Sequence, residues 1–182
     1  IFRFLLAFLL YNDGVQTVIM MATIYGKTEL DLDSADLIGA LLLTQAVGVP
    51  GSLLYGWLAK KFGSKKMLFA GILGYVVIIF YAFWMTKALD FWILAGMVGL
   101  FMGGIQAVSR GFYSRMIPAG MNAEYFGFFS VSQRFASILG PLMFALINDI
   151  TGSSKLSILS LLVLFVSGGM VLMKVKSPEE IE

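Results

Sequence analysis

The sequence contains no cysteine and no histidine among its 182 residues. Disulfides, thiolate nucleophiles and the usual zinc and copper sites are therefore excluded, and we expect neither a metal nor a cofactor. The absence of histidine leaves no side chain whose unperturbed pKa lies near neutrality, so a carboxylate would have to carry any proton that the protein handles. Since no two carboxylates stand at catalytic spacing, nothing in the sequence indicates an enzyme.

Charge is also scarce. Charged residues make up 13% of the chain, against about 25% in a typical soluble domain. Hydrophobic residues make up 59%, and they gather in blocks of roughly 20, the length that crosses the hydrocarbon core of a bilayer. The net charge of +2 is too small to suggest binding to nucleic acid. The composition therefore predicts an all-α, multi-pass integral membrane protein whose main neighbour is lipid.

Six apolar blocks are long enough to be membrane helices. The loops between them alternate between basic and neutral or acidic, and because Lys and Arg in short loops mark the cytoplasmic side, both termini are predicted to lie inside. The acidic tail 177–182 is predicted to be disordered, which leaves residues 1–176 as one six-helix domain. The predicted spans are residues 2–25, 37–59, 67–85, 91–109, 124–147 and 156–173.

The chain begins at Ile1, inside an apolar run and without a signal-peptide pattern, so we expect it to be part of a longer protein. Two features within the spans stand out. The fourth span carries four glycines (Gly96, Gly99, Gly103 and Gly104), which predicts a face for close helix packing. In the fifth span, Gly140-Pro141 predicts a break in the helix.

The most basic loop joins the second and third spans and reads GWLAKKFGSKK from Gly56 to Lys66. Its spacing resembles the signature loop of the major facilitator superfamily, which joins the second and third helices of each six-helix half. The matching residues are Gly56, Lys61, Gly63, Lys65 and Lys66. Lys60 departs from the pattern, because the family usually has an acidic residue there that helps to close the inner gate. An ordinary basic cytoplasmic turn is the alternative interpretation.

Two longer runs narrow the resemblance. One is GGIQAVSRGFYSRMIP at residues 103–118, and the other is EYFGFFSVSQRF at 124–135, followed by Leu139-Gly140-Pro141. Both resemble the vacuole-effluxer branch of the superfamily, named for a fungal autophagy-associated amino-acid exporter, and Asn12-Asp13-Gly14 fits the same branch. The resemblance covers nearly the whole chain and implies the C-terminal half of an alternating-access transporter. It also implies a three-plus-three inverted repeat, a cavity lined by the first and fourth spans, and a missing N-terminal half as partner.

Asp13 is the first candidate for a substrate or ion ligand. It lies about 15–18 Å along the first span, near the midplane, where an unpaired carboxylate is costly. We expect it to bind a substrate amine or a cation, or to carry a proton. Arg134 is predicted at a similar depth in the fifth span and could grip a substrate carboxylate. The alternative is a buried structural ion pair between the two.

Further candidates are polar residues in or beside the spans. Predicted cavity liners are Asn12, Gln16, Gln45, Gln106 and Gln133, each of which could equally form a hydrogen bond between helices. Near the inner face, a gate of forming and breaking salt bridges is one hypothesis, and plain positive-inside anchoring is the other. The residues for that gate are Arg110, Arg115 and Glu124, together with the signature loop.

The sequence thus favours a secondary active transporter, or permease, for a small polar solute, with amino acids as the first class to consider. A six-span scaffold or receptor that self-associates is the alternative. The membrane would be the plasma membrane in a bacterium or the vacuolar membrane in a fungus. An isolated six-helix chain would expose its cavity face, so we expect it to dimerise.

Overall fold

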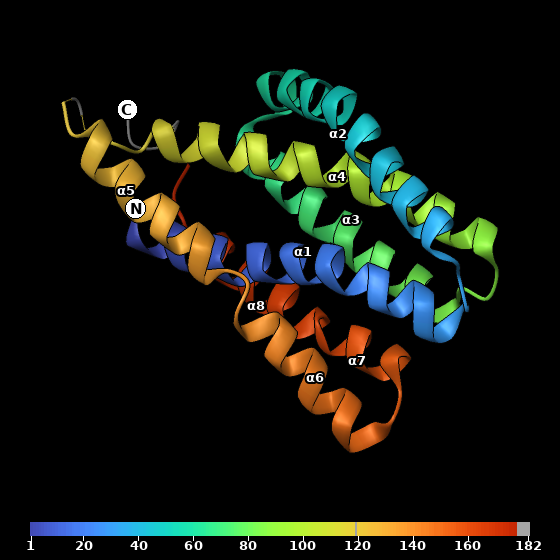
Figure 1. Cartoon of the computed structure of the whole chain (residues 1–182). Helices are drawn as coiled ribbons and strands as arrows, with labels where there is room; N and C mark the ends of the chain where they lie inside the picture. Colours follow the sequence, from blue (N-terminus) through green and yellow to red (C-terminus); the bar gives the residue numbers. More distant parts are fainter. Residues whose placement is uncertain (119, 178–182) are drawn as a thin grey trace.

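The structure is a computed structural model that describes residues 1–118 and 120–177, and regular structure in these residues is helical. In this part of the chain, eight helices pack into a bundle (Figure 1). Their bounds are α1 (Phe2–Glu29), α2 (Ser34–Phe62), α3 (Ser64–Trp84), α4 (Ala88–Ser114), α5 (Asn122–Phe135), α6 (Leu139–Thr151), α7 (Ser154–Ser160) and α8 (Leu162–Met173). The predicted tail beyond residue 177 lies outside the described residues.

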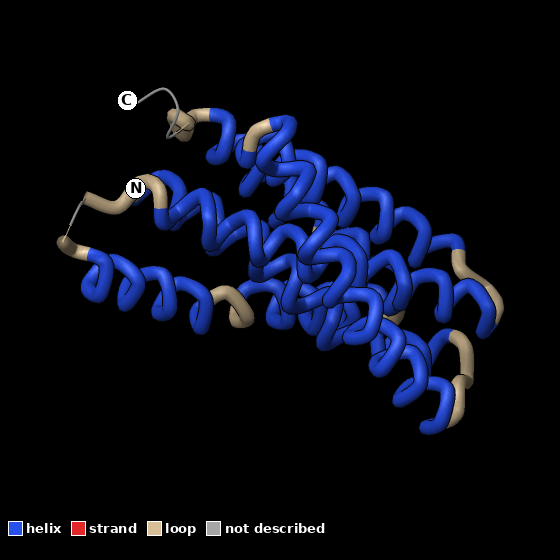
Figure 2. The backbone as a smooth tube through the Cα atoms, turned by 90° about the horizontal axis from the view of Figure 1, so that it is seen from above, coloured by secondary structure: helices blue, strands red, loops and turns tan. Residues whose placement is uncertain are grey.

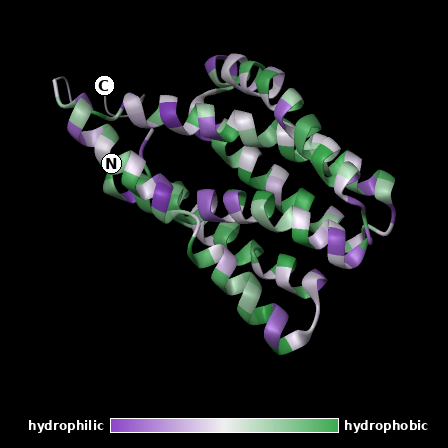
Figure 3. Ribbon diagram, viewed as in Figure 1, coloured by the Kyte–Doolittle hydropathy of each residue, from purple (hydrophilic) through white to green (hydrophobic). Residues whose placement is uncertain are grey.

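These eight helices make six stretches that are long and apolar enough to cross a membrane. The pairs α5–α6 and α7–α8 each form one stretch, and α1 to α4 are one stretch each. For the described residues, the prediction of an all-α fold with six stretches able to span a membrane is confirmed. Several helices outrun the predicted spans, because hydropathy reports the thickness of the hydrocarbon core and not where the hydrogen-bonded helix ends. The polar residues of the spans are few and concentrate at helix ends, apart from a group in the middle of α1 (Figure 3).

The signature loop was predicted as a short basic loop from Gly56 to Lys66, but the structure makes it a sharp corner between two helices. Lys60 and Lys61 are in the last turn of α2, and Lys65 and Lys66 are in the first turn of α3. Only Gly63 separates the helices, with φ at 91°, a conformation that favours glycine. Its N–H donates to the Ala59 carbonyl, and its own carbonyl accepts from Met67. Four lysines are therefore held at one end of the bundle, which we call the basic end.

Helices α2 and α4 pack backbone to backbone, as the glycines of the fourth span predicted. A Cβ on Gly99 would lie 2.5 Å from the Thr44 carbonyl oxygen, and one on Gly103 would collide with the Gly48 carbonyl. The Thr44 hydroxyl donates to the Ala95 carbonyl at 3.1 Å. Contacts of this kind replace the hydrophobic driving force that is missing between helices in lipid.

The fifth span is broken, but not at Gly140-Pro141. Figure 2 shows the loop-coloured interruption between α5 and α6, and α6 already begins at Leu139. Pro141 therefore sits in the first turn of α6, where its missing N–H removes no hydrogen bond and its fixed φ suits the helix. The break therefore lies before the Gly-Pro pair, at residues 136–138. A proline disfavours helix in the residues that precede it, but it fits the first turn of the helix that follows.

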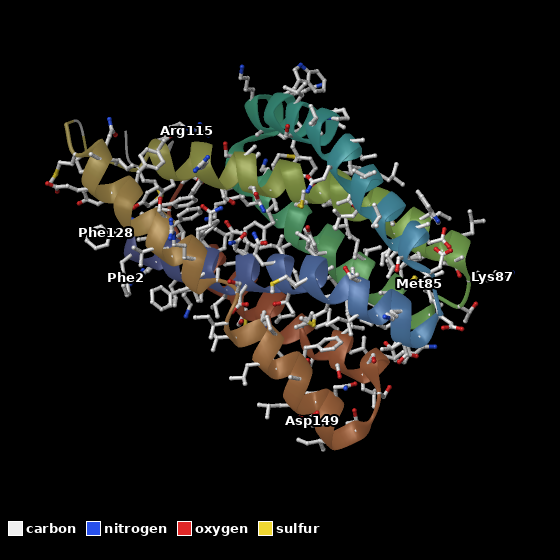
Figure 4. The ribbon with its side chains drawn as sticks, viewed as in Figure 1. Phe2, Met85, Lys87, Arg115, Phe128 and Asp149 are labelled. Atoms are coloured by element: carbon white, nitrogen blue, oxygen red, sulfur yellow. The ribbon has the colours of Figure 1, made fainter. Side chains whose placement is uncertain are left out.

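Aromatic side chains join α1, α4 and α5 at the basic end. Phe8 stacks on Phe129 with ring centroids 4.4 Å apart, and Phe4 packs on Phe112 at 5.0 Å. Tyr113 also stacks on Phe129. Phe128 instead points away from the bundle (Figure 4). This aromatic cluster is the main attachment of α5 to the rest of the molecule.

Candidate functional site

A hollow of about 230 Å³ lies between α1, α4 and α5, and we call it the central hollow. Two amides and one guanidinium reach it from two consecutive helices, α4 and α5. Gln106 and Arg110 are one turn apart on α4, and Gln133 comes from α5. Its lining consists of Phe8, Gly103, Gln106, Ala107, Arg110, Phe129 and Gln133.

The chemistry of the central hollow suits a small solute with polar and apolar parts. The amides of Gln106 and Gln133 offer both donors and acceptors, and the Arg110 guanidinium can bind a carboxylate with two parallel hydrogen bonds. The stacked rings of Phe8 and Phe129 supply an apolar wall. A few convergent polar groups in a mostly apolar recess are typical of a small-molecule site.

Asp13 is fully buried, and its carboxylate is occupied by the start of α6. One oxygen accepts from the Leu139 N–H at 2.9 Å, and the other accepts from the Gly140 N–H at 3.0 Å. The Thr17 hydroxyl donates to the second oxygen at 3.4 Å and more closely to the Asp13 carbonyl. A Cβ on Gly140 would collide with Thr17, so glycine allows this approach. Asp13 therefore caps α6 from another helix.

The structure does not bring Asp13 and Arg134 together. Arg134 is exposed on α5 and is not among the residues that line the central hollow. In residues 1–118 and 120–177, no ion pair joins the two side chains, and backbone N–H groups hold the carboxylate instead. The role of either residue in binding a solute or a proton stays a prediction.

The other predicted liners lie in different surroundings. Asn12 is buried, and its amide nitrogen has no hydrogen-bond partner in the structure. It lies one turn from Phe8 on α1, but it is not among the residues that line the central hollow. Gln16 is half-buried. Gln45 lines a separate, mostly apolar hollow between α1, α2 and α4.

The residues predicted for a gate divide into several groups. Lys65 donates to the Val175 carbonyl at 2.5 Å and to the Met173 carbonyl at 3.4 Å, which ties the start of α3 to the end of α8. Arg110 lines the central hollow, whereas Glu124 is exposed at the start of α5. Cations near the last carbonyls of a helix are stabilising, so Lys65 has a structural role that the signature pattern alone does not reveal.

Three of the remaining gate residues line a second hollow, of about 440 Å³, at the basic end. Gly56 and Lys60 reach it from α2, and Arg115 reaches it from the end of α4. Arg115 donates to the Ser64 hydroxyl and, at 3.3 Å, to the Gly111 carbonyl. Lys61 instead lies over the Trp57 ring, with Nζ 5.6 Å from the centroid, and Lys66 is exposed. We call this second recess the basic hollow.

Two contacts inside the bundle were missed by reasoning from the sequence. The Tyr11 hydroxyl lies 2.7 Å from the Ser109 hydroxyl, which in turn donates to the Ile105 carbonyl. The Tyr25 hydroxyl donates to the Ala82 carbonyl at 2.7 Å. Tyrosines well inside an apolar block were the available signal, because a buried phenol usually finds a hydrogen-bond partner.

Comparisons with known proteins agree with this architecture. The family described as "Vacuole effluxer Atg22 like" matches residues 1–180. The chain is 44% identical over 180 residues to the uncharacterized MFS-type transporter YxiO of Bacillus subtilis, covering 99% of the chain and 41% of that protein. It is 31% identical to Autophagy-related protein 22 of Vanderwaltozyma polyspora, covering 90% of the chain and 34% of that protein. For the protein of the same name from Saccharomyces cerevisiae, the identity is 31%, and 85% of the chain and 31% of the relative are covered. The chain thus spans between 31% and 41% of the length of these relatives.

Proposed function

Because this chain belongs to the Atg22-like vacuole effluxer family, we propose that it forms one six-helix half of a secondary transporter that moves a small polar solute by alternating access. The observation that carries the proposal is the central hollow, where Gln106, Arg110 and Gln133 converge inside an apolar bundle. Polar and charged groups at membrane depth are costly and mark solute pathways. The remainder of the transporter would form the opposite wall.

Amino acids are the solute class that we propose first. The Arg110 guanidinium suits a carboxylate, the two amides suit further polar groups, and the Phe8 and Phe129 rings suit an apolar side chain. In the present conformation, both oxygens of the Asp13 carboxylate accept N–H groups from the start of α6, so the carboxylate is not available to a substrate amine. A substrate or proton role for Asp13 would require the start of α6 to move away.

The test is solute uptake by proteoliposomes that contain the complete transporter, with an amino-acid panel and with or without a proton gradient. We expect Arg110→Gln and Gln133→Ala to abolish uptake of a solute that the wild type moves. Arg134→Gln is the discriminating variant, because it removes the same charge from the residue beside Gln133, which lies outside the hollow but was predicted from the sequence as a substrate ligand. Loss of uptake in Arg134→Gln with full activity in Arg110→Gln would contradict the site.

We also propose the plasma membrane as the location, supported by the higher identity to the bacterial relative than to the fungal ones. The scaffold alternative makes a different prediction for the same vesicles. A scaffold would reconstitute as a stable oligomer and move none of the solutes, whichever membrane potential or gradient is applied. Uptake that depends on Arg110 would exclude it.

A further inference from the structure

We propose that the basic hollow binds the phosphate of an anionic phospholipid headgroup, at a site separate from the central hollow and independent of the solute. Two helices supply its charge: Lys60 from the last turn of α2 and Arg115 from the end of α4. Both charged residues of the lining are basic. Phosphates prefer such guanidinium and ammonium donors.

The walls of the basic hollow leave room for a headgroup. Apart from Lys60, Arg115 and Val108, the lining is made of small residues, and a Cβ added to Gly56 or Gly111 would meet no atom within 4 Å. The Ser64 hydroxyl adds a polar group at the start of α3. The recess of about 440 Å³ is large enough for a phosphate with its glycerol. In Figure 4, Arg115 lies at the opposite end of the molecule from Lys87, so the recess sits at one membrane face.

A surface for acyl chains leads directly to this recess. Val49, Leu53 and Trp57 are 65%, 72% and 58% exposed, and their spacing of four residues places them along one side of α2. Lys60 continues that side one turn later. A lipid whose phosphate lies between Lys60 and Arg115 would therefore lay its chains along an apolar stripe, with Trp57 at interfacial depth. A soluble phosphate would make no use of that stripe, and for this reason we commit to the lipid.

Lys60 is also the residue that departs from the signature pattern. An acidic side chain at that position would oppose Arg115 across the hollow and repel a phosphate, whereas lysine makes both charged residues attractive to it. Basic recesses between membrane helices at the cytoplasmic face bind anionic headgroups, and each nearby Lys or Arg adds a similar amount to the binding free energy. The departure at Lys60 thus turns a site suited to an ion pair into one suited to an anion.

The experiment is native mass spectrometry of the complete protein in detergent, titrated with phosphatidylglycerol or with phosphatidylcholine of the same acyl chains. We expect phosphatidylglycerol to bind more tightly, and Lys60→Gln to weaken its binding by about fivefold. Lys66→Gln removes one charge from the same helix corner but does not line the hollow, and it should leave binding unchanged. Gly111→Leu should weaken binding by filling the space without changing the charge.

A competition arm identifies the source of the phosphate. If sn-glycerol 3-phosphate displaces phosphatidylglycerol and binds as tightly, the lipid proposal is overturned in favour of a soluble ligand. Equal binding of the two lipids, or equal effects of Lys60→Gln and Lys66→Gln, overturns it as well. The absence of any phosphatidylglycerol adduct in the wild type also overturns the proposal and would indicate that the remainder of the protein covers the hollow.

Arg115→Gln is a secondary variant, since its bond to Ser64 also supports the fold. The Lys60 and Gly111 variants keep the test independent of it.

Discussion

The Asp13 carboxylate does for α6 what an N-cap side chain does in a soluble helix, but it does so from α1. Helix α6 has no side-chain cap of its own, and Asp13 accepts the N–H groups of its first two residues. Water would solvate an open helix start, whereas in the hydrocarbon core each unsatisfied backbone group costs several kcal/mol. The break in the fifth span is therefore stable because a buried carboxylate closes it.

We predict that Asp13→Asn lowers the free energy of unfolding by about 1–3 kcal/mol, because the amide can accept with only one of its two polar atoms and leaves a buried N–H unpaired. Thermal unfolding followed by tryptophan fluorescence in detergent would measure it. Asp149→Asn is the control, since it removes an exposed carboxylate from α6 itself. An unchanged melting temperature in Asp13→Asn would show that the cap does not stabilise the protein.

The sequence predicted that Asp13 is buried and needs a partner, but it suggested Arg134. A guanidinium is visible in a sequence, whereas two backbone N–H groups freed by a helix break are not. The sequence feature that pointed to these N–H groups was the Gly140-Pro141 pair, because glycine permits close approach and proline suits the first turn of a helix. Backbone partners of this kind become evident only once the break is located.

At the scale of helices, α2 and α4 form a closely packed pair because glycines let their backbones touch. Gly51 adds to the contacts of Gly99 and Gly103, since its Cβ would lie 2.7 Å from the Leu100 carbonyl. The glycine face of α4 was predictable from residue spacing. Its partner was not, because any of five other spans could have met that face. Helix rotation and neighbour choice depend on packing that a single sequence does not reveal.

We predict that Gly99→Ala destabilises the protein by about 1–3 kcal/mol, since a methyl group would press against the Thr44 carbonyl. Gly96→Ala, three residues earlier on α4, meets no atom within 4 Å. It should stabilise the helix by up to about 1 kcal/mol, because alanine loses less backbone entropy than glycine. Chemical unfolding of the two variants beside the wild type would show opposite shifts of the midpoint. Shifts of the same sign would contradict the close α2–α4 packing.

For the molecule as a whole, the six spans were predictable because the thickness of a bilayer fixes the length of an apolar helix. The orientation in the membrane stays a prediction, based on the lysines and arginines of the basic end. The central hollow was predictable only in part. Gln106 and Gln133 were expected as cavity liners, but Arg110 was expected at a gate, and the structure brings all three to one recess.

The absence of cysteine from the chain offers a direct test of that orientation. We predict that a membrane-impermeant maleimide added to intact cells labels Thr86→Cys, an exposed residue between α3 and α4. It should label Asn122→Cys, an exposed residue at the start of α5, only after the cells are permeabilised. Labelling in the reverse order would mean that the basic end faces outward.

The cap on α6 also has a consequence for how the protein is made. Asp13 emerges from the ribosome in the first span, while its partners Leu139 and Gly140 lie 126 and 127 residues further along the chain. At usual elongation rates the carboxylate waits roughly 6–25 s for them. During that interval the carboxylate lacks the N–H groups that bind it in the folded protein. The first span is therefore expected to stay beside the insertion machinery until the fifth has been synthesised. A nascent chain stalled before α6 should therefore crosslink to the insertase through α1, and one stalled after α6 should be released into the bilayer.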